Sequence, residues 1–349
     1  MTIILFILVL LVTVLVHEWG HFIAAKKSGM LVEEFGFGIP PRLWSFKKGE
    51  TKYSINALPI GGFVKIAGEN GAENTVPYER QFESKPWYIK SIVLVAGVVC
   101  NFVLGLVLFT IAYTIGMPGM TPTGTPTVIG VVAGSPTEAS GITVGDTIQS
   151  LSVGGVMLTT VDTDQVRTAI QTSDGPVTVA YTHDGVPRVA TIEPAVSDTG
   201  RLMGIGIERI GIVKEPFFGA IATAWKQSVA LTGNIFSAIG TLVGGLLTGH
   251  GSTAGLIGPV GLAKEVGNAA TFGATYLLAF VATISLNLAV LNIMPFPALD
   301  GGRLLVVWGE ALTRRKFSAT TVGIIHTIGF LVLIGLMIVL TIGDIRRAL

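Results

Sequence analysis

Four long apolar stretches, separated by polar segments, dominate the pattern along the chain. They lie at Thr2–Ala25, Ser91–Met117, Tyr276–Met294 and Thr320–Ile342. An α-helix needs about 20 apolar residues to cross the hydrocarbon core of a bilayer, and these stretches approach or exceed that length. We therefore expect a polytopic α-helical membrane protein with about four transmembrane helices. The first stretch has no basic segment before it, which favours a retained span over a cleaved signal peptide.

A fifth apolar stretch, residues 217–247, is ambiguous. It is long enough to span a membrane, but Lys226, Gln227 and Asn234 interrupt it. A fifth span here would also move the basic cluster at 314–316 to the other side of the membrane. We therefore expect an amphipathic helix that lies on the outer membrane surface, with its polar face in water.

The distribution of Lys and Arg predicts how the spans are oriented. Residues 26–90 hold ten of the 23 Lys and Arg residues and 314–316 add a cluster, whereas residues 120–215 contain only five. Positively charged loops tend to remain in the cytoplasm. Segments 26–90 and 314–316 are therefore predicted to be cytoplasmic, and 120–215 to lie outside.

The external segment has a different pattern. A Gly/Pro/Thr-rich linker is expected at 116–127, and turn residues separate the short β-type runs that follow it. A helix is expected among them at 163–172. The runs are "TVIGVV", "DTIQSLSV", "PVTVAYT", "RVATIEP" and "MGIGIE". This pattern predicts one small α+β domain.

Composition agrees with a membrane protein and excludes some functions. Half of the residues are hydrophobic and only 13% are charged, against about 25% charged in a soluble domain. The formal charge of +1 gives no sign of nucleic-acid binding, and a single cysteine, Cys100, excludes an intrachain disulfide framework. Three further histidines, His183, His250 and His326, are interpreted as structural.

Candidate chemistry begins with "HEWGH" at the end of the first span. Residues four apart on a helix share one face, so His17 and His21 can bind the same metal ion. Glu18 projects beside them, where a metalloprotease places the carboxylate that takes a proton from water. The alternative is two histidines that only hydrogen-bond to neighbouring helices. Ionisable residues within a membrane are costly and usually functional, which favours the metal.

A catalytic zinc ion with two histidines needs a third protein ligand and an open position. The segment "NIMPFPALDGG", residues 292–302, ends a span that runs in the same direction as the first, so it reaches a similar depth. Pro295 and Pro297 break the helix, and such backbone is tolerated at membrane depth only where protein or a watery cavity surrounds it. Asp300 is the predicted third ligand; the alternative is a cap for the helix that begins at Gly301.

These two motifs together resemble the site-2 protease family of intramembrane zinc metalloproteases, in its bacterial regulated-intramembrane-proteolysis branch. The resemblance covers most of the chain. Residues 54–69 are similar to the family's membrane-associated β-hairpin region, and residues 80–102 resemble its entry into the second span. Residues 127–155 resemble a circularly permuted PDZ domain, and "GPVGLAKEVG" matches a further family segment.

The resemblance implies a role for each catalytic candidate. His17, His21 and Asp300 would bind Zn²⁺, and Glu18 would be the general base. The first of these, His17, lies roughly 22 Å along its helix from Thr2 at about 1.5 Å per residue, which places the site near the cytoplasmic face of a core about 30 Å thick.

The resemblance also implies substrate-binding residues. Asn292 would hold the substrate or stabilise the oxyanion, although a hydrogen bond between helices is nearly as well supported. The broken segment would contact the substrate through Pro295 and Pro297, and the hairpin through Gly61 and Gly62.

The implied substrates are single-span transmembrane proteins, such as an anti-sigma factor or a remnant signal peptide. An upstream site-1-type protease would trim them first, and this chain would then cut inside the lipid bilayer. It would be a multi-pass protein of the bacterial inner membrane with its PDZ-like domain outside. That domain would exclude large substrates or bind a newly made C-terminal carboxylate, and the sequence does not choose between the two.

These predictions divide the chain into seven parts. They are the first span (1–25), a cytoplasmic β-hairpin and loop region (26–90), the second span (91–117), the PDZ-like domain (118–212), the surface helix with a Gly-rich connection (213–272), the third span with its break (273–313), and the fourth span with the C-terminus (314–349).

Three rival interpretations remain. A membrane PDZ scaffold with a structural metal would normally offer four protein ligands, and the sequence offers three. A solute transporter would show paired broken helices in an inverted repeat, and the sequence shows one break. A soluble zinc protease conflicts with the apolar run "IILFILVLLVTVLV" that leads into the motif.

Overall fold

The computed structural model divides the chain into two compact units, residues 1–115 with 215–349, and residues 116–214. It describes residues 2–69, 71, 75–132, 134–158, 168, 170–171, 175–197, 200–249 and 257–348. Each unit has its own hydrophobic core and is described separately.

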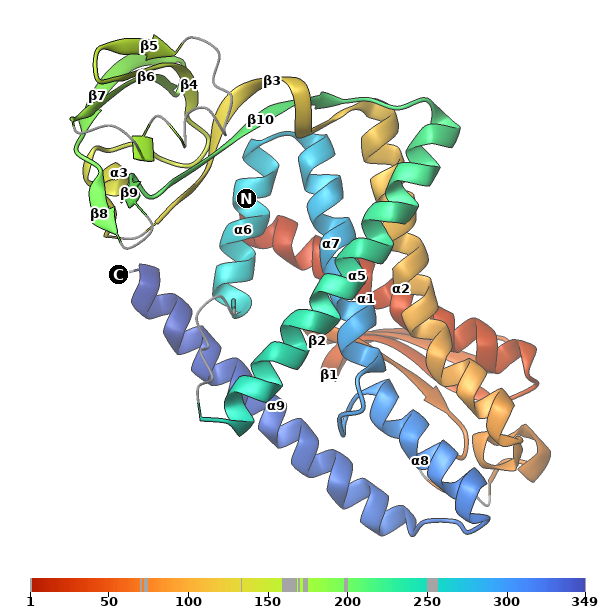
Figure 1. Cartoon of the computed structure of the whole chain (residues 1–349). Helices are drawn as coiled ribbons and strands as arrows, with labels where there is room; N and C mark the ends of the chain where they lie inside the picture. The colour runs from red at the N-terminus through yellow and green to blue at the C-terminus, as the bar shows by residue number, and fades with distance from the viewer. Residues whose placement is uncertain are drawn as a thin grey trace. The chain divides into compact units, whose positions relative to one another are not determined.

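The first unit consists of helices around a β-hairpin (Figure 1). Its elements are α1 (Thr2–Lys27), β1 (Val32–Lys48), β2 (Thr51–Ile66), α2 (Trp87–Ile115), α5 (Phe217–Leu247), α6 (Pro259–Thr271), α7 (Ala274–Ile293), α8 (Asp300–Thr313) and α9 (Ala319–Ala348), with short 3-10 turns at Tyr78–Arg80 and Phe82–Ser84. The four predicted spans correspond to α1, α2, α7 and α9, close to their expected positions. Helices suit lipid because they satisfy their own backbone hydrogen bonds.

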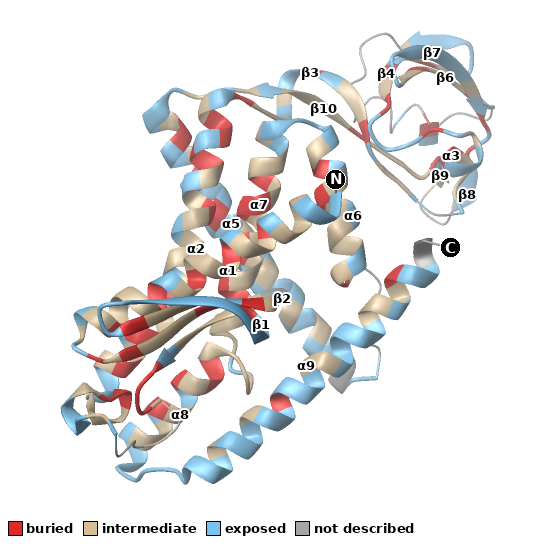
Figure 2. Cartoon of the chain, turned by 180° about the vertical axis from the view of Figure 1, so that it is seen from behind, coloured by how far each residue is buried: buried red, intermediate tan, exposed pale blue. Residues whose placement is uncertain are grey.

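Within the described residues, five helices are long and apolar enough to cross a membrane, so the predicted count of four is not confirmed. The additional helix is α5, the least apolar of the five. The polar residues that interrupt α5 lower its mean hydropathy, but α5 is still apolar enough to cross a membrane. Figure 2 shows that α5 and α9 are mostly exposed, whereas buried positions gather in α1, α2 and α7.

Small residues let the central helices approach closely, as is common between membrane helices. A Cβ added to Gly20 of α1 would lie 2.4 Å from the carbonyl oxygen of Ala96 in α2. Farther along α2, a Cβ added to Gly105 would lie 2.8 Å from the Leu286 side chain of α7. These two contacts place α1 and α7, which carry the two candidate motifs, against the same helix, α2.

The predicted hairpin is present as β1 and β2, which pair antiparallel. The first part of β1 pairs on both sides, since Phe35 is opposite both Tyr53 and Val64 of the bent strand β2. The last part of β2, Gly62–Ile66, therefore forms an edge of the sheet. A buried core fixes this edge, and it contains Val32, Ile66, Val93, Leu94 and Leu304 from the hairpin, α2 and α8.

The second unit is a β-sheet with a short helix. Its elements are β3 (Met117–Val131), α3 (Pro136–Ala139), β4 (Thr147–Val153), β5 (Val156–Leu158), β6 (Val177–His183), β7 (Val186–Ile192), β8 (Ala195–Ser197), β9 (Gly200–Leu202) and β10 (Ile205–Val213). The main sheet has the order β10-β3-β4-β6-β7, with β5 beside β4. Its core includes Leu151 of β4 and Val177 and Val179 of β6, and the last two are two residues apart, so they share one face of their strand.

One prediction for this unit is wrong and another lies outside the described residues. The expected linker at 116–127 is instead most of strand β3, which pairs with β10 from Met117 onward. Its prolines are tolerated because β3 meets β4 only at Thr127, so the earlier part is an edge strand. The helix expected at 163–172 lies mostly outside the described residues.

Candidate active site

Three side chains that are far apart in the sequence meet at one point in the first unit. Nε2 of His17 lies 3.0 Å from Oδ2 of Asp300, and Nε2 of His21 lies 3.2 Å from the same oxygen. The two Nε2 atoms are 3.1 Å apart. His17 and His21 are only 5% and 8% exposed. In the part of the chain that the structure describes, this is the one group of three such residues placed to hold a metal ion.

This triangle of atoms fits a tetrahedral zinc ion. Zinc binds imidazole nitrogen and carboxylate oxygen at about 2.0–2.2 Å, which places two ligand atoms about 3.3 Å apart. Two imidazoles and one carboxylate leave the fourth position open, as in catalytic zinc sites. A cation also explains why two buried imidazoles turn the same nitrogen toward one carboxylate oxygen.

The histidines are oriented by groups on α2. His21 donates its Nδ1–H to the carbonyl oxygen of Val93 at 2.8 Å, which leaves the lone pair of Nε2 for a metal. Asn101 is fully buried, its Nδ2 lies 3.4 Å from Nδ1 of His17, and its Oδ1 has no hydrogen-bond partner among the described residues. Turning this amide by half a turn would let Oδ1 accept the Nδ1–H of His17, so it would orient that ring in the same way.

Asp300 reaches the histidines because the chain breaks between α7 and α8. The α8 helix begins at Asp300, its N-cap residue is Leu299, and no side-chain capping bond is formed. The carboxylate of Asp300 instead meets the two imidazoles, which favours the ligand role over the alternative of a helix cap. The next residue, Gly301, has no room for a side chain, because a Cβ there would lie 2.2 Å from the carbonyl oxygen of Ile293.

Glu18 lies beside the metal ligands and next to the edge of the hairpin. It is within electrostatic range of both imidazoles and of Asp300. A Cβ added to Gly62 of β2 would lie 3.1 Å from Cγ of Glu18. The hairpin edge therefore runs past the predicted general base, and the glycine at 62 allows that close approach.

The remaining predicted residues occupy different surroundings. Asn292 lies close to the ligands, with its Nδ2 3.2 Å from Nε2 of His17. Gly61 has a φ of +87° with open space around it, which suits glycine. Pro295 is exposed, whereas Pro297 packs against Gly329 of α9. Contact of these residues with a substrate stays a prediction.

Sequence reasoning did not single out Gly97 of α2. A Cβ at this position would lie 2.5 Å from Nε2 of His21 and 2.7 Å from Cε1 of His17, so a side chain would fill the space between the rings. Glycine is common in membrane helices, and its position in the sequence gives no signal that distinguishes this role from ordinary helix packing.

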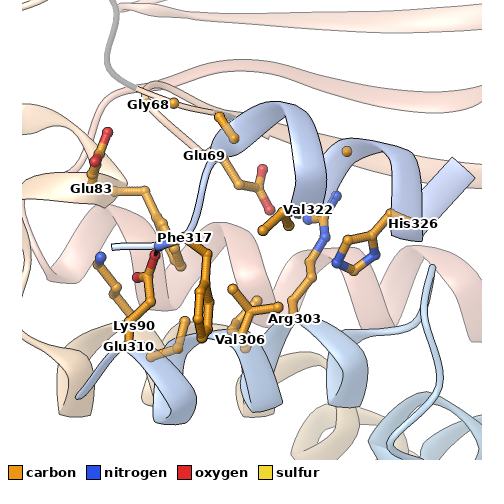
Figure 3. Close-up of a pocket in the computed structure, with 16 residues that line it drawn as sticks. Gly68, Glu69, Glu83, Lys90, Arg303, Val306, Glu310, Phe317, Val322 and His326 are labelled. Atoms are coloured by element: carbon orange, nitrogen blue, oxygen red, sulfur yellow. Dashed lines mark hydrogen bonds and ion pairs between the residues drawn. The ribbon is translucent and has the colours of Figure 1, made fainter. Parts of the chain in front are cut away.

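A separate cavity of about 360 Å³ lies between the end of the hairpin, α2, α8 and α9 (Figure 3). Its lining includes Glu69, Arg303 and His326, and does not include the three candidate metal ligands. Arg303 forms an ion pair with Glu69, which ties the first turn of α8 to the end of the hairpin.

Comparison with known proteins adds independent information. Residues 5–336 match Peptidase family M50. The chain is 35% identical over 336 residues to the protein named "Putative zinc metalloprotease CPE1693" of Clostridium perfringens, covering 95% of each chain. It is also 29% identical over 422 aligned positions to the zinc metalloprotease RasP of Geobacillus kaustophilus, covering 99% of this chain and 98% of the relative.

Proposed function

The chain belongs to peptidase family M50 and is a zinc metalloprotease, and on that premise we propose that it cleaves a peptide bond within the transmembrane segment of single-span membrane proteins. One observation carries the proposal: the His17, His21 and Asp300 side chains converge, and the two histidines lie on α1, an apolar helix that is long enough to cross a membrane.

Each residue of the site has a distinct part in this proposal. His17, His21 and Asp300 would hold Zn²⁺, which when bound polarises a scissile carbonyl and lowers the pKa of a coordinated water to about 7. Glu18 accepts the proton from the attacking water and passes it to the leaving amine. Asn292, 3.2 Å from Nε2 of His17, donates a hydrogen bond to the substrate carbonyl beside the ligands.

A helical substrate must unwind before hydrolysis because its amides are hidden in hydrogen bonds. Exposed backbone groups in lipid cost several kcal/mol each, so the unwound stretch needs a partner. The hairpin edge at Gly62–Ile66 supports strand addition there, since among the described strands it pairs only with β1 and passes Glu18. Substrates with helix-destabilising residues near the cytoplasmic face are therefore preferred.

The proposed orientation follows the Lys and Arg distribution, with α1, α2, α7 and α9 as spans and α5 on the outer membrane surface. The hairpin, the Asp300 break and the start of α9 face the cytoplasm, where the basic residues of 26–90 and 314–316 lie. The second unit lies outside the bacterial inner membrane. A site near the cytoplasmic face gives water a short path to Glu18.

We propose that the second unit is a PDZ-like filter or dock for substrates already trimmed by an upstream protease. A cavity of about 700 Å³ beside β10 supports a docking role, and its lining includes Ile170, Met203 and Ile207. All seven residues of the "LMGIGIE" segment, 202–208, line this cavity. Size exclusion by the unit as a whole is the alternative.

A scaffold with a structural metal is less well supported. The described residues bring together three ligand side chains and leave a coordination position open, whereas structural zinc is normally held by four protein ligands. A general base beside the ligands would also have no purpose in a structural site.

Reconstitution of the full-length enzyme in lipid vesicles tests the proposal. A single-span reporter with Gly and Pro near one end of its span is offered beside a matched reporter with an all-Leu span, and the products are mapped by mass spectrometry. We expect cleavage within the span of the reporter that contains Gly and Pro. This cleavage should be lost with a zinc chelator and recovered with added zinc. Cleavage only outside the span, or cleavage that survives chelation, would contradict the proposal.

A further inference from the structure

The break between α7 and α8 is held by a side chain of α9. Ala298 donates its backbone N–H to Nδ1 of His326 at 2.9 Å. One turn along α9, the backbone approaches so closely that a Cβ on Gly329 would lie 2.5 Å from the side chain of Pro297. His326 and Gly329 are three residues apart and share one face of the helix. The face of α9 that meets the break thus provides a hydrogen-bond acceptor at His326 and, at Gly329, the space that Pro297 occupies.

The break depends on this support more than a regular helix would. Its two prolines have no N–H, and the amides of Met294, Phe296 and Leu299 donate to main-chain oxygens within 291–296. Ala298 alone in this stretch uses a side chain from elsewhere. It also has a φ of +78°, a conformation that residues other than glycine rarely adopt without support from their surroundings.

The Ala298 amide lies two residues before Asp300, so its position sets where the carboxylate emerges. The first turn of α8 has a second tie, the ion pair between Arg303 and Glu69. Figure 3 shows His326 beside Arg303 at one end of the cavity. Asp300 therefore reaches the two histidines of α1 from a segment that is held both by α9, through His326, and by the end of the hairpin, through Glu69.

We propose that His326 is a positioning residue of the zinc site, which acts through the Ala298 amide to hold the Asp300 carboxylate against His17 and His21. This proposal rests on the proposed function, in which Asp300 is a zinc ligand. It gives α9 a part in metal binding although, among the described residues, no side chain of α9 contributes to the metal-binding group.

The test compares variants of the full-length protein purified in detergent. His326→Leu removes the acceptor, and His326→Asn restores it because Asn Oδ1 occupies nearly the place of His Nδ1. Thr327→Val is the matched control, since the Thr327 hydroxyl donates to the carbonyl oxygen of Gly323 within α9 itself. Zinc affinity is measured by competition with a chromophoric chelator, and metal geometry by the visible spectrum of the Co²⁺-substituted protein.

We expect His326→Leu to weaken zinc binding by roughly tenfold or more, as loss of outer-shell partners does, and to change the Co²⁺ spectrum. His326→Asn should recover both, and Thr327→Val should match the wild type. Wild-type affinity and spectrum in His326→Leu, or an Asn variant no better than Leu, would overturn the proposal. If His326→Leu does not fold, Gly329→Ala is used instead, because its added methyl group would displace Pro297 in the same break. Reduced zinc affinity in this variant supports the proposal, and unchanged affinity contradicts it.

Asp300→Ala separates this proposal from the proposed function. If Asp300→Ala loses zinc while His326→Leu binds as the wild type does, only the positioning role fails. If Asp300→Ala keeps wild-type zinc affinity, the proposed ligand set itself fails.

Discussion

The three predicted metal ligands come from two segments of opposite character. His17 and His21 lie on the regular helix α1, where spacing of four residues alone places both rings on one face. Asp300 follows a break with two prolines and a left-handed Ala298, and a pair of glycines comes directly after it. The helix presents its ligands through local geometry, whereas the break presents its ligand only because α9 and the hairpin hold it.

The difference teaches where each kind of substitution acts. On α1, zinc binding depends on the identity of the ligands and on the space left for them by α2. At the break, zinc binding also depends on residues that are remote in sequence.

The largest expected effect comes from the base on the helical side. Glu18→Gln keeps the size of the side chain but cannot accept a proton, so turnover of a membrane reporter should fall by roughly 10³-fold. Zinc content should stay at one per chain because Glu18 is not a predicted ligand. Turnover measured with zinc analysis checks this, and retained turnover would remove Glu18 as the base.

Gly97→Ala tests the space that α2 leaves for the histidines. A Cβ there would lie 2.5 Å from Nε2 of His21, so zinc affinity should fall by roughly tenfold or more, comparable to loss of an outer-shell partner. Ala is favoured over Gly in a helix by about 1 kcal/mol, so helix destabilisation cannot explain a loss. Gly233→Ala in α5, where a Cβ meets nothing within 4 Å, is the matched control. Equal zinc affinity in both variants would show that the space is not needed.

Ala298→Val tests the strain of the break. A β-branched residue at a φ of +78° should lower the free energy of unfolding by about 1–3 kcal/mol and weaken zinc binding with it. Ala298→Gly relieves the strain but adds unfolded-state entropy, so its net effect should stay within about 1 kcal/mol. Thermal unfolding in detergent and chelator competition measure both. A Gly variant that is less stable than the Val variant would contradict this explanation.

The smallest effect concerns an exposed ion cluster that ties the hairpin turn to the end of α1. Glu50 accepts hydrogen bonds from Lys26 at 2.6 Å and Arg80 at 2.8 Å, and these two cations lower the pKa of its carboxyl below the usual 4.5. Since the folded-state pKa is lowered, the stabilisation is present above about pH 4.5 and is lost as the pH falls through the lowered pKa.

Glu50→Gln should therefore cost under about 1 kcal/mol at pH 7, and the difference from the wild type should shrink at low pH and in high salt. Thermal midpoints at two pH values measure it. A difference that persists in acid would mean that packing, and not charge, is responsible.

The sequence predicted the parts of the site that depend on local pattern. Apolar length located α1, α2, α7 and α9, and the spacing of "HEWGH" placed two ligands on one face. Matching the depths of two parallel spans was enough to select Asp300. These predictions rest on helix geometry and on the cost of charge in lipid, which can be judged from the sequence of each span.

What the sequence missed depends on contacts between segments. Nothing in the pattern shows that Gly97 faces the histidines, that Asn101 lies beside His17, or that His326 bonds to Ala298. The proline-rich segment 116–127 suggested a linker because Pro disfavours strands, and only its edge position makes β3 possible. The number of spans was also not fixed, since α5 combines sufficient length with polar interruptions.

X-ray absorption at the zinc edge tests the central claim most directly, with the purified full-length protein compared with Asp300→Ala. The wild type should hold one zinc per chain with two imidazoles and a carboxylate oxygen at about 2.0–2.2 Å, and Asp300→Ala should lose the metal or the carboxylate signal. A wild-type protein without zinc, or identical spectra from the two proteins, would contradict the account.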